Sequence, residues 1–366
     1  MTDELLVRRD GALGRLTLNR PRALNAITLA MVRAMAAALD SWEHDDAVTT
    51  VLLDGAGERG LCAGGDVRFL YDDAARGGHG FPVLLAEEYR LDARIARYPK
   101  PYVALMDGVV MGGGVGVSAH GSIRVVTERT VLAMPEVSIG YVPDVGGTWL
   151  LARAPGELGT HVALAGARLT GADAIACGLA DVLVPSARLR DLVAALAALP
   201  AHRAAARRHS RQHPADVSAV GRVVAGFAVD PGPPPLLAER AWVDRCYAAD
   251  DVGKIVARLR AEGMTGTADA ITAQSPVALV LTLGALRAAR GDTALEQSLE
   301  REYRLTRACV RRPDFAEGVR ARLVDRDHAP RWRPPTLDGV TDDVVAAFLH
   351  GTDLPTDPPL GLPRAP

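Results

Sequence analysis

The sequence predicts an α/β core followed by a helical C-terminal region. The first half of the 366-residue chain alternates short apolar strands with stretches of helical periodicity, which is typical of α/β architecture. Helical patterns alone continue after about residue 185, and a proline-rich stretch at 230–235 interrupts them. We therefore expect a core over residues 1–195 and a helical region over residues 196–366.

Local patterns predict the elements of the core in order. Residues 13–19 alternate apolar and polar side chains, which predicts a strand, and Thr28 is a typical N-cap for a helix that runs to about His44. Apolar runs and helical spacing predict the remaining elements: strands at 51–53, 103–106, 123–126 and 131–134, and helices from about 66 and over about 82–97.

The C-terminal helices are expected to pack on the core. A helical block covers about residues 236–325, and Pro276 begins one apolar helix at a position where its missing N–H does no harm. Apolar stripes, such as Val277 with Leu281, have to be buried against a partner surface. The proline-rich end of the chain, residues 353–366, is expected to be frayed.

Composition excludes several classes of protein. Hydrophobic residues make up 48% and charged residues 23%, and the net charge of −2 gives no basis for nucleic-acid binding. The first ten residues lack the apolar segment of a signal peptide, and no run approaches about 18 apolar residues. The four cysteines form no CxxC pair and are interpreted as reduced thiols. We expect a cytoplasmic protein that binds no membrane.

The stretch MDGVVMGGGVGVSAHG, residues 106–121, places six glycines after a predicted strand. It lacks the GxGxxG and Gly-Lys-Ser/Thr patterns of phosphate loops and the complete GxSxG nucleophile motif, and the chain has no metal-ligand pattern such as HExxH. Small residues that begin a helix leave backbone N–H groups accessible, which can form half of an oxyanion hole. Tight helix packing is the alternative use of these glycines.

Two further stretches favour the oxyanion-hole interpretation. Residues 57–66 form a second loop of small residues after a predicted strand, which can supply a second N–H donor. Residues 133–147 place Glu136 and Asp144 in an apolar segment rich in glycine and proline, where carboxyl groups are paired or have a raised pKa. Helix capping is the alternative, stronger for Asp144 than for Glu136, where no helix start is evident.

These motifs resemble the enoyl-CoA hydratase/isomerase (crotonase) superfamily. The stretches CAGGDVR, MGGGVGVSAHG and AMPEVSIGYVPDVGG resemble most closely its 3-hydroxyisobutyryl-CoA hydrolase branch, as does the distal stretch that begins with EREYRLTRACVRRPDF. The resemblance runs from about Leu13 to about Pro335. It implies a crotonase-like spiral core of ββα turns with a helical C-terminal region.

The resemblance also implies roles for individual residues. Ala63 and Gly113 match the two amides of the oxyanion hole, Glu136 matches the catalytic glutamate, and Asp144 matches a second acid of the hydrolase branch. Glu88 matches a substrate-contacting glutamate, although the adjacent Glu87 makes a solvated helix face the alternative. The segment with Arg22 and Leu24 matches a loop near the nucleotide end of CoA, and a plain surface arginine is the alternative for Arg22.

Gly116 indicates which reaction is expected. Hydratases of this family carry a first glutamate at this position, and without it the addition of water to a C=C bond lacks one acid–base partner. The expected activity is hydrolysis of a 3-hydroxyacyl-CoA thioester, most of all 3-hydroxyisobutyryl-CoA, with Glu136 as base or as nucleophile. No cofactor is expected beyond the CoA of the substrate, and a homo-oligomer is left open. The alternatives are an enoyl-CoA hydratase/isomerase and a non-catalytic CoA-thioester-binding protein.

Overall fold

The computed structural model describes residues 3–76, 80–200, 219–349 and 358–362. Close packing divides the chain into two compact units, each made of segments from several parts of the sequence. The first unit comprises residues 1–65, 90–132 and 169–235, and the second comprises residues 66–89, 133–168 and 236–366.

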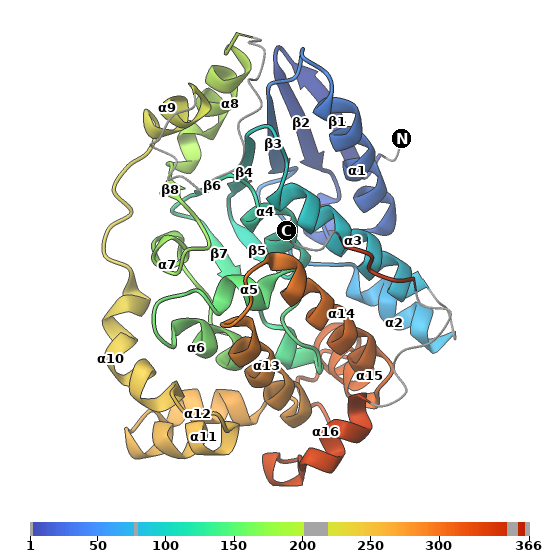
Figure 1. The fold of residues 1–366 in the computed structure, drawn as a ribbon. Helices are drawn as coiled ribbons and strands as arrows, with labels where there is room; N and C mark the ends of the chain where they lie inside the picture. The colour runs from blue at the N-terminus through green and yellow to red at the C-terminus, as the bar shows by residue number, and fades with distance from the viewer. Residues whose placement is uncertain (1–2, 77–79, 201–218, 350–357, 363–366) are drawn as a thin grey trace. The chain divides into compact units, whose positions relative to one another are not determined.

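The first unit is built on a six-stranded sheet. Its order is β1-β2-β3-β4-β6-β8, with β1 antiparallel to β2 and every following pair parallel (Figure 1). The strands have these bounds: β1 Leu5–Asp10, β2 Leu13–Leu18, β3 Thr50–Gly55, β4 Tyr102–Met106, β6 Ile123–Val126 and β8 Val182–Leu183. The predicted strands at 13–19, 51–53, 103–106 and 123–126 are confirmed, whereas β1 was not predicted.

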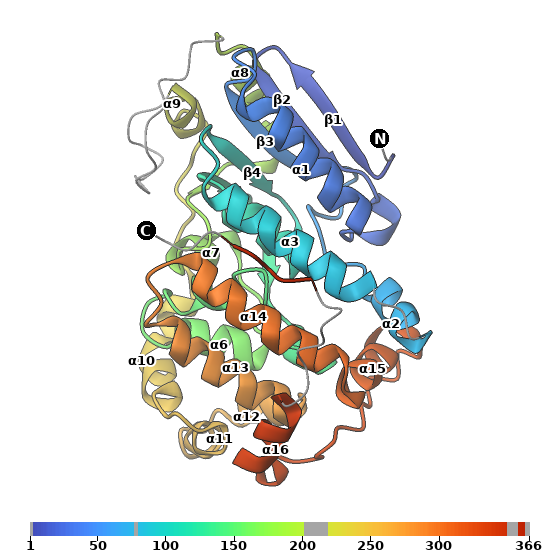
Figure 2. The same cartoon turned by 45° about the vertical axis from the view of Figure 1, so that its right-hand side comes forward.

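Helices cover both faces of this sheet. Thr28 caps α1 (Leu29–Glu43) by accepting a hydrogen bond from Met31 N, as the sequence predicts. A Cβ at Gly14 of β2 would lie 2.8 Å from the ring of Trp42, so α1 packs on that face. The neighbouring Leu13 points to the opposite face, where it joins a core with Leu192 of α8 (Leu189–Ala197) and residues of α9 (Ala219–Ala225). Figure 2 shows α1 lying along the strands.

Shorter elements complete the first unit. Strand β5 pairs with β7 in a small second sheet, and α4 follows β5 directly. Their bounds, with those of the remaining helices of this unit, are β5 Val109–Met111, β7 Val131–Ala133, α4 Gly113–Ala119, α7 Gly171–Ala176, η1 Pro21–Ala23 and η3 Ser186–Arg188. The glycine cluster therefore begins a helix, as predicted.

The second unit is almost entirely helical. Helix α3 continues into the first unit after Tyr89, and α10 begins at Pro235, the last residue of the first unit. The other helices belong to the second unit alone. The bounds are α2 Val67–Ala75, α3 Gly80–Ala96, η2 Glu136–Ile139, α5 Gly147–Leu151, α6 Leu158–Ala165, α10 Pro235–Tyr247, α11 Val252–Ala261, α12 Thr265–Thr272, α13 Pro276–Ala289, α14 Leu295–Val310, α15 Pro313–Val319, η4 Arg320–Val324, η5 Leu337–Gly339 and α16 Asp342–Leu349.

The division differs from the predicted boundary near residue 195. Segments 66–89 and 133–168 belong with the C-terminal helices, because α13 packs against α5 and α6 while α15 packs against η2 and α2. The expectation of a frayed end is wrong for part of the tail: Leu360 is buried, and Tyr303 Oη donates to Pro358 O at 2.7 Å. The rest of that tail, 353–357 and 363–366, lies outside the described residues.

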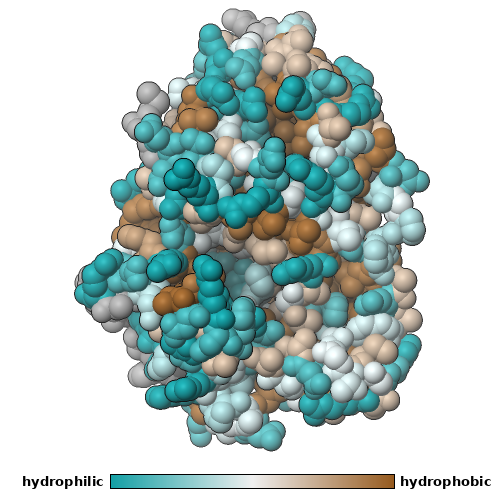
Figure 3. Space-filling model, turned by 180° about the vertical axis from the view of Figure 1, so that it is seen from behind, coloured by the Kyte–Doolittle hydropathy of each residue, from teal (hydrophilic) through white to brown (hydrophobic). Residues whose placement is uncertain are grey.

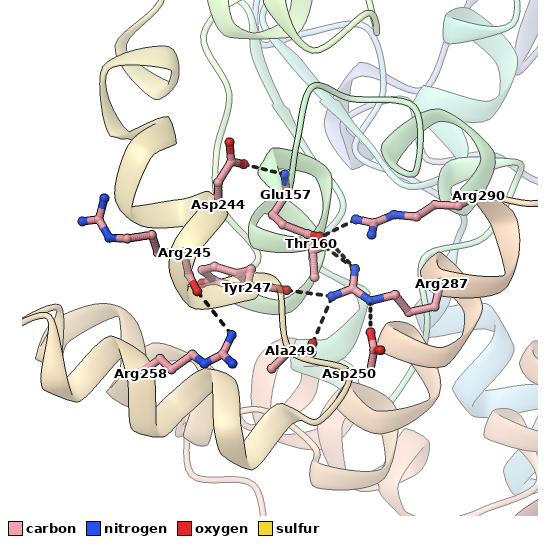
Figure 4. A network of polar contacts seen from close by, with 10 residues as sticks. All are labelled: Glu157, Thr160, Asp244, Arg245, Tyr247, Ala249, Asp250, Arg258, Arg287 and Arg290. Carbon is pink, nitrogen blue, oxygen red and sulfur yellow. Dashed lines mark hydrogen bonds and ion pairs between the residues drawn. The ribbon is translucent and has the colours of Figure 1, made fainter.

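A polar network stabilises the second unit around Glu157, which precedes α6 (Figure 4). Its carboxylate accepts hydrogen bonds from Arg287 at 2.9 Å and Arg290 at 2.7 Å, both at the end of α13. Arg287 also donates to the carbonyl oxygens of Tyr247 and Ala249. This network ties the end of α10 to α6 and α13 and includes no predicted catalytic residue.

No single helix in the described part of the chain has the length and apolar character to cross a membrane. Only α12 and α13 together reach these limits, and they meet at a bend of 106°. On the face shown in Figure 3, hydrophobic residues form separate patches among hydrophilic ones.

Candidate active site

Asp144 lies at the centre of a group of polar side chains in the second unit. Its Oδ2 accepts hydrogen bonds from Tyr89 Oη at 2.6 Å and from Tyr141 Oη at 3.2 Å. The side chain is buried, at 6% exposure. The backbone carbonyl of Asp144 accepts a hydrogen bond from Gly147 N, but its carboxyl group bonds to the two tyrosines. The Asp144 side chain therefore does not cap the following helix, which was the alternative interpretation.

Glu88 and Glu136 are the two other predicted acids of this unit. Glu88 is 4% exposed, which excludes the alternative of a solvated helix face. Glu136 begins the 3₁₀-helix η2, so the expectation that no helix starts there is wrong, although its side chain makes no cap hydrogen bond. Glu88 Oε1 and Glu136 Oε2 are buried with no hydrogen-bond partner among the described residues. Buried unpaired oxygens are costly, and they are available to a bound molecule.

Burial and mutual repulsion raise the pKa of each of these acids. Burial raises the pKa of Asp144 to about 6, against the opposing effect of its two tyrosine donors. Burial, followed by the negative charge of Asp144, raises the pKa of Glu88 to about 8. The same two causes in the same order raise the pKa of Glu136 well above its ordinary value. Near neutral pH the ionised form is therefore suppressed at Glu88 and Glu136, beside an Asp144 that is mostly ionised.

Packing of the C-terminal helices fixes the segment that carries Glu136 and Asp144. A Cβ at Gly140, which has φ +68°, would lie 2.6 Å from the backbone of Asp314 in α15. The ring of Tyr141 lies 5.6 Å from that of Phe315, and Ser275 N donates to Val137 O. Only glycine allows this close approach of α15 to the end of η2.

Sequence analysis missed Tyr89, Tyr141 and Glu302 as members of this site. Glu302 of α14 is fully buried and accepts hydrogen bonds from the loop that follows Asp144. One signal could have identified Glu302, because it occupies a stripe of α14 otherwise filled by buried, mostly apolar residues at heptad spacing. No comparable sequence pattern marks Tyr89 and Tyr141, whose positions are typical of ordinary core aromatic residues.

The candidate amide donors lie in the first unit. Gly112, with φ +49°, precedes α4 and makes Gly113 its first residue, with an N–H outside the intrahelical hydrogen bonds. A Cβ at Gly114 would lie 2.7 Å from Cys62 O, and one at Gly64 would lie 3.9 Å from Gly113 N. The small residues therefore allow the loop at residues 62–65 to lie directly on the start of α4.

Ala63 does not fit the donor role that the resemblance gives it. Its N–H already donates to Leu24 O at 3.0 Å. The amides of Gly65 and Gly113, in contrast, have no hydrogen-bond partner among the described residues. The physical reason is the parallel bridge between Ile27 and Gly65, which turns successive amides of this loop in alternate directions.

The segment with Arg22 and Leu24 also lies in the first unit. Arg22 is exposed, and Arg59 donates to the carbonyl oxygens of Pro21 and Arg22. Asn25 is buried and donates from Nδ2 to three carbonyl oxygens of residues 56–61.

Two observations concern other chemistry. The four cysteines are buried and form no disulfide, as predicted. Within residues 3–76, 80–200, 219–349 and 358–362, no group of three His, Cys, Asp or Glu side chains is arranged to hold a metal ion.

Comparisons with known proteins agree with this architecture. The chain is 40% identical over 347 residues to the mitochondrial 3-hydroxyisobutyryl-CoA hydrolase of Gallus gallus, covering 93% of this chain and 87% of that protein. Among solved structures, a carnitinyl-CoA dehydratase from Mycobacterium thermoresistibile is 47% identical with a TM-score of 0.88, and 98% of each chain is covered. An enoyl-CoA hydratase from Rhodobacter sphaeroides is 40% identical with a TM-score of 0.81, covering 95% of this chain and 97% of the other.

The family model described as enoyl-CoA hydratase/isomerase matches residues 13–349, nearly the whole chain. The predicted fold class and the predicted resemblance are thereby confirmed, and the chain belongs to the enoyl-CoA hydratase/isomerase family.

Proposed function

We propose that this protein hydrolyses the CoA thioester of a 3-hydroxy acid, with 3-hydroxyisobutyryl-CoA as the preferred substrate. The observation that carries the proposal is the buried set of acids in the second unit, in which Glu88 and Glu136 each keep an unpaired oxygen. A substrate hydroxyl and an attacking water are groups that such oxygens can bind. The activity named for the avian relative supports the same reaction.

Glu136 is the base or the nucleophile of the proposed reaction. As a base, it takes a proton from water while the water oxygen attacks the thioester carbon, and the C–S bond then breaks as the CoA sulfur gains a proton. As a nucleophile, it forms an anhydride with the acyl group, CoA leaves as the thiol, and water then cleaves the anhydride. The raised pKa makes Glu136 a stronger base once it is ionised.

A single turnover in ¹⁸O-labelled water separates the two routes. The anhydride route can transfer the label to the Glu136 carboxyl group, which mass spectrometry of the digested protein detects. Direct attack of water places the label in the product acid only.

Negative charge that develops on the thioester oxygen requires fixed donors. In this proposal the amides of Gly113 and Gly65 supply them, and Gly65 replaces Ala63, whose N–H is already bonded to Leu24. Removal of one such donor typically costs about 10²–10³-fold in kcat. The resemblance to the family implies that Gly113 acts in the same reaction as Glu136 and Asp144, and Gly65 takes the place that the resemblance gives to Ala63.

Asp144 and Glu88 orient the substrate. Two tyrosine donors to Asp144 Oδ2 favour its ionised form, so it is the first of the three acids to lose its proton. A carboxylate at this place can accept a hydrogen bond from the 3-hydroxyl group of the substrate or from the attacking water. The reaction as proposed needs no cofactor, because water is the only other reactant.

Two of the similar structures carry the names of a dehydratase and a hydratase, so hydration is the second candidate function. Gly116 argues against it, because the family's hydratases have a glutamate at this position. Here the residue is glycine in the buried helix α4, and it offers no acid–base group.

Thiol release from matched thioesters tests the proposal. We expect release from 3-hydroxyisobutyryl-CoA to exceed that from isobutyryl-CoA by at least about 10-fold in kcat/KM, because the analogue lacks the hydroxyl group and leaves the buried acids unpaired. Equal rates would contradict the role given to Asp144 and Glu88. Absence of release from every 3-hydroxyacyl-CoA would favour the CoA-thioester-binding protein instead. The cytoplasmic location also stays a prediction, since the avian relative is named as mitochondrial.

A further inference from the structure

Glu302 makes an unusual set of contacts for a carboxyl group that is fully buried. It lies in the middle of α14, on the stripe that includes Leu299 and Thr306. Oε2 accepts a hydrogen bond from Gly146 N at 2.7 Å, and Oε1 accepts from Thr148 N at 2.9 Å and from the Thr148 hydroxyl. Three hydrogen bonds to one carboxyl group therefore come from two residues, Gly146 and Thr148, of a single loop.

That loop is the one that carries Asp144. Immediately after Asp144 the backbone enters the left-handed region at two successive residues, with φ +54° at Val145 and +78° at Gly146. This conformation is unfavourable for a β-branched residue such as Val145, and it persists only where the surroundings hold it. Gly146 and Thr148, which bond to Glu302, lie on both sides of Gly147, the first residue of α5.

The loop itself supplies no side-chain cap for α5, because Gly146 occupies the N-cap position and has no side chain. Gly147 N donates to Asp144 O, whereas the N–H groups of Gly146 and Thr148 donate to Glu302. An apolar residue at position 302 would leave buried donors unpaired.

We propose that Glu302 is a positioning residue, which holds the backbone on the C-terminal side of Asp144 so that the Asp144 carboxyl group meets Tyr89 and Tyr141. This inference rests on the proposed function only in giving Asp144 a role in substrate orientation. It gives the C-terminal helical region a role in the site, because Glu302 lies 154 to 156 residues away in the sequence from the residues that it holds. We call the hydrogen bonds from Gly146 and Thr148 to Glu302 the clamp.

Both oxygens of a carboxyl group can accept hydrogen bonds, which suits the converging donors of this loop. Burial raises the pKa of Glu302 to about 8, against the opposing effect of these donors. Glutamine fills the same volume but turns an NH₂ group toward one of the donors. Glu302→Gln is therefore a nearly isosteric change that breaks one arm of the clamp.

The first test measures the clamp without using activity. Hydrogen exchange should become about 10-fold faster or more at the amides of Gly146 and Thr148 in Glu302→Gln, as expected when a protecting hydrogen bond is lost. Glu300→Gln, an exposed position on the same helix, should leave these amides unchanged. Unchanged exchange in folded Glu302→Gln would overturn the proposal, even if the protein proved not to be a hydrolase.

The second test asks whether Glu302 acts through Asp144. We expect Glu302→Gln to lower kcat for thiol release by about 10-fold or more, because small misplacements of a reacting group have effects of this size. In a protein that already carries Asp144→Asn, adding Glu302→Gln should lower kcat by less than about 2-fold, because the carboxyl group that Glu302 positions is absent. A wild-type kcat, or an equal loss in both backgrounds, would overturn the inference.

Discussion

The candidate amide donors of the first unit and the acids of the second are positioned by different means. Gly65 lies in the loop that follows β3 and Gly113 begins α4, and the absence of a Cβ at Gly114 lets that loop approach α4 closely. Asp144 depends on side chains far away in the sequence: Tyr89 lies 55 residues before it, and the loop after it is held by Glu302. Adding a methyl group should therefore damage the first arrangement, and removing a distant partner should damage the second.

The largest effect is expected at Glu136. Glu136→Gln keeps the size of the side chain but removes the base or nucleophile, so kcat should fall by about 10²-fold or more while CoA-ester binding is kept. Thiol release and a direct binding measurement check this together. Near wild-type turnover by the folded variant would remove Glu136 from the mechanism.

A smaller but still large effect is expected from Gly114→Ala in the first unit. The new Cβ would lie 2.7 Å from Cys62 O and 2.8 Å from Cys62 Cβ, so the loop and α4 have to separate. We expect a loss of about 1–3 kcal/mol in the free energy of unfolding and a lower kcat.

Gly284→Ala in α13 is the matched control for this substitution. A Cβ there meets nothing within 4 Å, and alanine favours the helix by about 1 kcal/mol. If both variants behaved alike in chemical denaturation and in thiol release, close approach of the backbones would not be what the glycines provide.

A moderate effect is expected on the pH dependence of the reaction. Glu136 must be ionised to act, and burial followed by the negative charge of Asp144 raises its pKa well above the ordinary value, so kcat/KM should rise as pH increases. Asp144→Asn removes a negative charge that raises the pKa of Glu136 and of Glu88. The profile should therefore move to lower pH, by about one unit, in addition to any loss of rate.

Tyr141→Phe serves as the control for this shift. It removes one donor to Asp144 but keeps the charge, and the loss of that donor raises the pKa of Asp144. Its profile should not move to lower pH. If the pH profile of kcat/KM moved to lower pH in both variants, the charge of Asp144 would not be the cause of the shift.

The smallest effect concerns stability. The pKa of Glu302 is about 8 in the folded protein against an ordinary 4.5, so the folded state retains a proton that the unfolded state has lost between these pH values. The free energy of unfolding should therefore decrease as pH rises through this window. In Glu302→Gln, the slope of the free energy of unfolding against pH should correspond to about one proton fewer than in the wild type. Urea denaturation at several pH values from 5 to 8 measures this slope. An unchanged slope would assign the retained proton to another group.

Much of the first unit could be predicted because its signals are local. The alternation of LGRLTL marks β2, and Thr28 caps α1 as its sequence position predicts. Strand β1 escaped prediction because Arg8, Arg9 and Asp10, at the sheet edge, interrupt its apolar pattern.

The site residues of the second unit were harder to predict from the sequence, for a different physical reason. Segment 133–147 revealed its acids through residue type alone, whereas Tyr89, Glu302 and Phe315 contribute only after the chain has brought distant helices together. The role given to Ala63 failed because a motif identifies a loop but does not show which of its amides is already paired. The buried tail residue Leu360 likewise has no local signal.

The choice between hydrolysis and hydration tests the account most directly. The same enzyme preparation is given 3-hydroxyisobutyryl-CoA, with release of the free thiol recorded, and crotonyl-CoA, with loss of the enoyl absorbance recorded. With Glu136 present and glycine at position 116, we predict rapid thiol release and little hydration. Hydration of crotonyl-CoA faster than thiol release from the hydroxy ester would contradict the account.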